Sequence, residues 1–202
     1  LDIDDKNKQI IGKPFPTNLK ETTLSGYYAT GGSGDKKLVY RTSVINSYPE
    51  YPIFEGERYV GLAYKYMLID QDYKLLTLNQ PLVIVDYQND GSSASMYRQY
   101  WNNPKGFAFF RKTEMMYTPS KKRTIISCIH YVASSIISKN KRFIQESPRP
   151  LLTLLVAPLG YIWYLFIKHK KGCKICNGTG YKGRKGVFEY LQMSNPVREM
   201  IN

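Results

Sequence analysis

Acidic side chains at three places in the first half of the chain have a setting that suits chemistry. Glu55 and Glu57 flank Gly56 just before a periodic apolar run. Asp90 follows a strand-like run, and Asp35 lies in a glycine-rich turn. A carboxylate can take a proton from a hydroxyl group as a general base, or bind Mg²⁺ or Mn²⁺ through its oxygens. Each also has an ordinary alternative, because acids favour helix first turns and Asp before Gly is common in turns.

A cysteine pair near the end of the chain has metal-ligand spacing. Cys173 and Cys176 form a CxxC pair, which is half of a four-ligand zinc site. Cys128, His130 and His169 are the residues that would complete such a site. A pair without metal is the alternative, and both interpretations stay open. Three cysteines in all do not form a disulfide framework, which favours a reducing compartment.

Positive charge is concentrated in the second half of the chain. The net charge is +13, yet residues 1–100 contain 11 Lys and Arg against 12 Asp and Glu. Residues 101–202 contain 18 and 4. A basic field of this kind suits anionic lipid, a phosphorylated substrate or nucleic acid. The hydrophobic content of 43% predicts a folded chain rather than a disordered one.

The most apolar segment, residues 151–167, decides between these partners. It is 17 residues long, contains Tyr161, Trp163 and Tyr164, and has basic residues on both sides. This length is at the lower limit for crossing a bilayer, and a buried core helix is the alternative. Cationic flanks with aromatic residues are typical of a segment at the cytoplasmic membrane surface. Nucleic-acid binding favours basic and aromatic residues interleaved on a polar surface, so an anionic membrane is the predicted partner.

Periodicity predicts an α+β fold. Spacings of three and four residues predict helices over 57–70 and 122–138, with shorter helices over 43–48 and 95–101. Alternating or continuous apolar runs predict strands over 37–40, 74–78 and 81–87. Five glycines within residues 172–186 mark a sharp change of composition after Lys171.

Four segments resemble, in order, the acceptor-side half of bacterial family-2 glycosyltransferases of cell-surface polysaccharide pathways. They are Gly34-Asp35-Lys36, the stretch from Pro49 through Glu55-Gly56-Glu57-Arg58 to Ile69-Asp70, residues 85–93, and Asn103-Pro104-Lys105-Gly106-Phe107-Ala108. The resemblance covers about residues 1–170. It implies an incomplete GT-A-like half, with a few strands and several helices, that lacks the nucleotide-binding half and is inactive alone.

The resemblance also implies a reaction and a set of site residues. The reaction is transfer of a sugar from a nucleotide-sugar, with inversion, to a polysaccharide or lipid-linked acceptor at the cytoplasmic face of the bacterial inner membrane. Glu57 matches the position of the general base, and Glu55 is the other candidate. A divalent Mg²⁺ or Mn²⁺ would contact Asp90. The implied substrate- and diphosphate-binding residues are Asp35, Lys36, Asp90, Ser93, Arg98, Gln99 and Trp101.

Residues 172–202 resemble a different family, the type II secretion and type IV pilus assembly ATPases, in their zinc-knuckle region. This resemblance implies zinc at Cys173 and Cys176, in an incomplete site. We therefore predict three parts: a glycosyltransferase-like region (1–120), a basic and apolar helical membrane-associated region (121–171) and a secretion-ATPase-like tail (172–202). Fusion of two unrelated sequences near Lys171 is one hypothesis for this arrangement. A non-enzymatic membrane-binding module and a secretion-ATPase fragment are the alternative functions.

Overall fold

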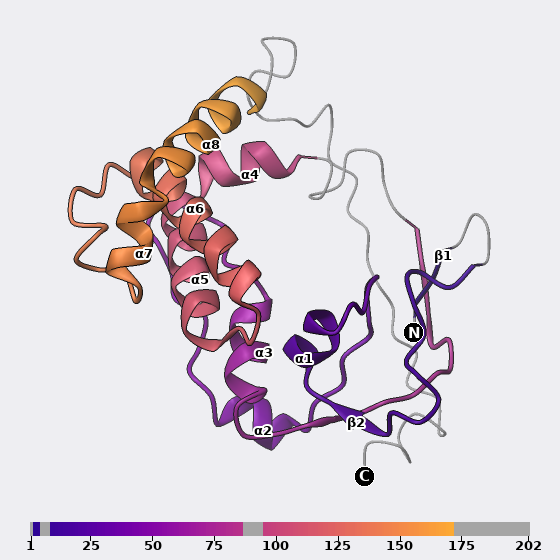
Figure 1. Cartoon of the computed structure of the whole chain (residues 1–202). Helices are drawn as coiled ribbons and strands as arrows, with labels where there is room; N and C mark the ends of the chain where they lie inside the picture. Colours follow the sequence, from indigo (N-terminus) through magenta and orange to yellow (C-terminus); the bar gives the residue numbers. More distant parts are fainter. Residues whose placement is uncertain (1, 5–8, 87–94, 172–202) are drawn as a thin grey trace.

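The computed structural model describes residues 2–4, 9–86 and 95–171 (Figure 1). Its fold is α+β, as the sequence predicts, with helices dominating. The elements in chain order are β1 (Asp2–Asp4), β2 (Glu21–Thr22), α1 (Leu24–Ala29), α2 (Thr42–Asn46), α3 (Ala63–Ile69), β3 (Leu75–Leu76), β4 (Val83–Val85), α4 (Met96–Asn102), α5 (Pro104–Tyr117), α6 (Lys121–Ile137), α7 (Pro150–Leu155) and α8 (Ala157–Lys170).

Helices α4 to α8 gather on one side of the molecule, and the short strands lie on the other (Figure 1). Helix α6 packs against both α5 and α8, and α4 packs on α8. The core of this helical layer is formed by Met115, Cys128, Tyr131 and Val156. A Cβ atom at Gly160 would lie 2.4 Å from the Cβ atom of Val132, so the absence of a side chain allows α8 to approach α6 closely.

The strands form two separate two-stranded sheets. β1 and β4 are parallel, with Asp2 opposite Val83, and β2 and β3 are antiparallel, with Glu21 opposite Leu76. The strands predicted over 74–78 and 81–87 are thus present, although they are shorter and belong to different sheets. The strand predicted over 37–40 does not form. Tyr40 instead stacks its ring on Tyr66 of α3, at 5.4 Å between centroids.

The predicted helix over 57–70 is wrong in its first half. Helix α3 begins only at Ala63, because tertiary hydrogen bonds hold the residues before it outside a helix. The backbone N–H of Arg58, for example, donates to Oδ1 of Asn103 at 2.8 Å. Glu57 therefore does not lie in the first turn of its own helix. The helix predicted over 122–138 is confirmed as α6, where the Ser120 hydroxyl accepts from the N–H of Arg123 at the N-cap.

The apolar run over 151–167 folds as two helices rather than one. Helix α7 ends at Leu155 and α8 starts at Ala157, with Pro158 in its first turn. Proline fits the first turn of a helix but interrupts a continuing one, which explains the break. Within the described residues, no helix has both the length and the hydropathy needed to cross a bilayer.

Candidate functional site

Glu57 binds the N-terminus of helix α5 through both carboxylate oxygens. Oε1 accepts from the backbone N–H of Lys105 at 2.9 Å, and Oε2 accepts from that of Gly106 at 2.7 Å. The first N–H groups of a helix have no partner within the helix and carry its positive partial charge, so a carboxylate there is stabilising. Segments 55–58 and 103–108, both of which resemble glycosyltransferase motifs, thus contact each other.

This geometry has a consequence for the predicted base. A general base must point a lone pair at the substrate hydroxyl. Each oxygen of Glu57 already accepts one bond from α5, so only its remaining lone pairs are available to a substrate hydroxyl. Glu55, the other candidate, lies exposed in the adjoining turn, two residues before Glu57. The structure therefore gives the two glutamates different settings, which the sequence did not separate.

Asp35 and Lys36 lie in the loop that follows α1, away from the Glu57–α5 junction. The ammonium of Lys36 donates to the carbonyl oxygens of Ser33 at 2.7 Å and Gly34 at 3.3 Å. Burial lowers the pKa of Lys36, partly offset by the charges of Asp2 and Asp35. Lys36 thus stabilises its own loop, and the loop is not brought against Glu57.

Helix α4 contains Arg98, Gln99 and Trp101, which the glycosyltransferase resemblance implies as substrate-binding residues. Oε1 of Gln99 accepts from Nδ2 of Asn103 at 3.0 Å, which joins α4 to the start of α5. The Trp101 ring stacks on Tyr164 of α8, and the Lys171 ammonium lies 3.5 Å from the Trp101 centroid. In this structure, Gln99 and Trp101 connect helices.

Four predicted site residues lie outside the described residues: Asp90, Ser93, Cys173 and Cys176. Of the residues considered as further zinc ligands, Cys128 is buried in the helical core. The His130 ring packs between Tyr100 and Trp163. No group of three or more His, Cys, Asp or Glu side chains suited to a metal occurs within the described residues. The zinc and divalent-metal sites therefore stay predictions.

A pocket of about 240 Å³ opens beside Glu57. Its walls come from the non-helical segment before α3, namely Tyr51, Pro52, Ile53, Phe54, Glu57, Arg58, Tyr59, Val60 and Leu62. The Tyr51 hydroxyl donates to the carbonyl oxygen of Leu62 at 2.8 Å, and the Tyr59 ring stacks on Phe107 at 4.6 Å. The pocket is thus lined by aromatic rings held by the rest of the fold.

A buried ion network that sequence reasoning missed joins α5 to α6. Glu114 is 2% exposed and pairs with Arg111 and Arg123, and it also accepts from the Ser127 hydroxyl at 2.7 Å. Burial raises the pKa of Glu114, but the charges of both arginines outweigh it and the net shift is downward. The only sequence signal was the spacing of three residues between Arg111 and Glu114, which is equally common on exposed helix faces.

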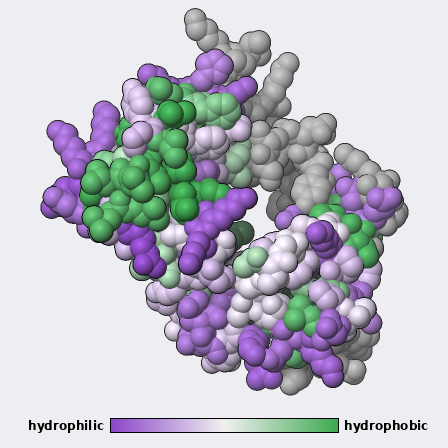
Figure 2. Space-filling model, viewed as in Figure 1, coloured by the Kyte–Doolittle hydropathy of each residue, from purple (hydrophilic) through white to green (hydrophobic). Residues whose placement is uncertain are grey.

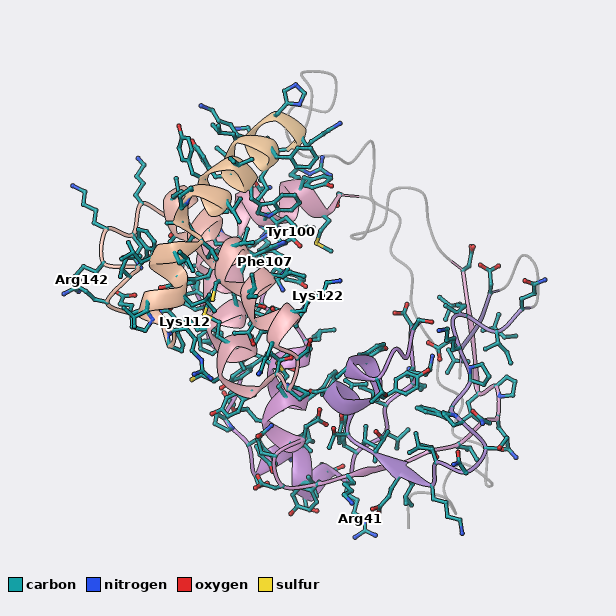
Figure 3. All side chains as sticks on the ribbon, viewed as in Figure 1. Arg41, Tyr100, Phe107, Lys112, Lys122 and Arg142 are labelled. Atoms are coloured by element: carbon teal, nitrogen blue, oxygen red, sulfur yellow. The ribbon has the colours of Figure 1, made fainter. Side chains whose placement is uncertain are left out.

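His130 lies next to this network. Burial, assisted by the charges of Arg111 and Arg123, lowers the pKa of His130 to about 3. The imidazole is therefore neutral at physiological pH. Tyr100 of α4 and Phe107 of α5 lie side by side in the same layer, with ring centroids 4.5 Å apart (Figure 3). This region is an aromatic and charged interior that holds the helices together.

The outer side of α7 and α8 exposes a large apolar surface, which Figure 2 shows in green. The residues of this α7–α8 apolar face recur mostly at spacings of three and four, and Leu151 and Leu155 are 83% and 76% exposed. Exposed basic residues lie before α7 (Lys139, Lys141, Arg142, Arg149) and at the end of α8 (Lys168, Lys170). The face consists of Leu151, Leu154, Leu155, Leu159, Tyr161, Ile162, Leu165 and Phe166.

Comparison with known proteins finds one partial likeness. A segment of 61 residues, 30% of the chain, is 36% identical to the type II secretion system protein E of Aeromonas hydrophila. The segment spans 11% of the length of that relative. No family model and no solved structure matches the chain. The likeness supports the secretion-ATPase-like part of the sequence interpretation and adds nothing to the glycosyltransferase part.

Proposed function

We propose that the chain works at the surface of an anionic bilayer as the acceptor-side region of an inverting glycosyltransferase. The observation that carries this proposal is the α7–α8 apolar face with basic residues at both ends. Contiguous exposed apolar surface on a soluble protein marks an interaction site. An anionic membrane fits this one, because leucine side chains enter the acyl boundary while lysine and arginine remain at the headgroups.

Membrane binding is tested by vesicle flotation of the full chain. Replacing Leu151 and Leu155 by Ser should reduce partitioning into anionic vesicles about thirtyfold, because two inserted leucines contribute about 2 kcal/mol or more. The matched control is the pair Ile53→Ser and Leu76→Ser, which changes two side chains of similar exposure that do not belong to the face. Wild-type chain that stays with the soluble fraction would reject the proposal.

The glycosyltransferase part rests on the ordered resemblance of residues 34–108 and on the setting of the two glutamates. Glu55 is exposed and adjoins the pocket segment, whereas Glu57 is engaged with α5. We assign Glu55 as the general base and Glu57 as the residue that positions the loop. The base would remove the proton from the acceptor hydroxyl as that oxygen attacks the anomeric carbon and the nucleotide diphosphate leaves.

The assignment is tested by joining the chain to a nucleotide-binding half and measuring sugar transfer. Glu55→Gln should lower kcat by about a hundredfold or more without changing stability, as expected for loss of a general base. The companion variant Glu57→Gln should lower the free energy of unfolding. Full activity of Glu55→Gln would contradict the assignment, and equal loss in both variants without destabilisation would return Glu57 to the base role.

The partial likeness to a secretion ATPase favours a second candidate for part of the chain. In that case the cysteine-containing segment would be a zinc-stabilised contact element of a secretion assembly. Cys173 and Cys176 would supply two of four ligands, and the others would come from elsewhere.

A further inference from the structure

The aromatic rings that line the pocket beside Glu57 each contact another part of the fold. Tyr51 is fixed by its hydroxyl bond to the Leu62 carbonyl, and Tyr59 by its stacking on Phe107. The Phe54 ring lies against Phe109 of α5, with centroids 6.0 Å apart. Aromatic walls suit a ligand that presents a flat apolar face. The volume of about 240 Å³ has room for one ring with a substituent.

Two charged residues, Glu57 and Arg58, line this pocket. They differ in whether a group of opposite charge contacts them. The Glu57 carboxylate is bound by two N–H groups at the positive end of α5. Arg58 also lines the pocket, and its guanidinium has no carboxylate partner within the described residues. Its backbone N–H is fixed to Asn103 at 2.8 Å, which holds the base of the side chain in place. The pocket therefore presents one uncompensated cation beside aromatic walls.

We propose that this pocket binds a phosphorylated monosaccharide. The guanidinium of Arg58 would form a bidentate pair with the phosphate, whose oxygens match the fork of its N–H groups. The apolar C–H face of the sugar ring would pack on Tyr51 and Tyr59. The inference stands apart from membrane binding and sugar transfer, because it needs neither vesicles nor a nucleotide-sugar.

The test is ligand binding by the full chain in solution, measured by calorimetry or ligand-observed NMR. The probes are glucose 1-phosphate, inorganic phosphate and glucose. Glucose 1-phosphate should bind most tightly, because it alone engages both the cation and the rings. Arg58→Gln should weaken it tenfold or more, which corresponds to loss of a charge-assisted hydrogen bond.

Arg41→Gln is the matched control, because it removes one exposed cation at the N-cap of α2 (labelled in Figure 3) that does not line the pocket. It should leave the affinity unchanged. Equal affinities for wild type and Arg58→Gln would overturn the proposal, as would the absence of binding by the wild type. Inorganic phosphate binding as tightly as glucose 1-phosphate would overturn the assignment of the ring subsite.

Discussion

Replacing Glu114 by Gln should lower the free energy of unfolding by about 3–5 kcal/mol, the range for breaking a buried ion pair. Glu114 is 2% exposed and Arg111 is 5% exposed, so the arginine would be left charged inside the helical layer without its partner. The side chain of Arg123 is half exposed and can turn to solvent. Urea denaturation followed by far-UV circular dichroism measures the effect.

An ion pair at the surface serves as the control that distinguishes the effect of burial from the effect of charge. Glu146 pairs with Lys112 at 3.1 Å, and both side chains are partly exposed. Glu146→Gln should therefore lower the free energy of unfolding far less than Glu114→Gln does. The double variant Arg111→Met with Glu114→Leu should recover most of the loss, because an apolar pair of similar size needs no desolvation. A small effect of Glu114→Gln, equal to that of Glu146→Gln, would mean that the network is solvated.

The second large effect is expected at Gly106, where alanine should destabilise the fold by about 2–4 kcal/mol through overpacking and lost hydrogen bonds. An alanine Cβ there would lie 2.1 Å from the carbonyl oxygen of Tyr59, so the start of α5 must move. That movement would break both bonds to Glu57. Alanine normally stabilises a helix relative to glycine by about 0.5–1 kcal/mol. A loss of stability in Gly106→Ala would therefore show that the clash outweighs helix propensity.

Changes at Gly106 and at Glu57 should have non-additive effects on the free energy of unfolding. If Gly106→Ala acts by separating α5 from the carboxylate, the double variant with Glu57→Ala should cost clearly less than the two single changes together. Lys105→Ala is the local control. Its side chain is exposed and its backbone N–H is retained, so the change should stay within about 0.5 kcal/mol. Additive effects of Gly106→Ala and Glu57→Ala would show that the clash acts independently of the Glu57 anchor.

Contacts between distant parts of the chain explain why the sequence indicated Glu57 and Gly106 as parts of motifs but did not predict what they contact. Glu57 and Gly106 were noticed as parts of two motifs, 49 positions apart. Local patterns predicted Glu57 as a helix first-turn acid, and it does stabilise a helix terminus. The helix is α5 rather than its own. Asp70 behaves likewise, because its carboxylate accepts from Leu24 and Ser25 at the start of α1.

The sequence by itself determined the α+β class, helix α6 and the apolar, basic-flanked character of residues 151–167. These depend on periodicity and composition, which act locally. The tertiary structure alone decided that α3 begins at Ala63, that the α7–α8 apolar face is left uncovered, and that Glu57 is bound on both oxygens. Those outcomes depend on contacts between residues far apart in the chain, whose energies outweigh local propensity.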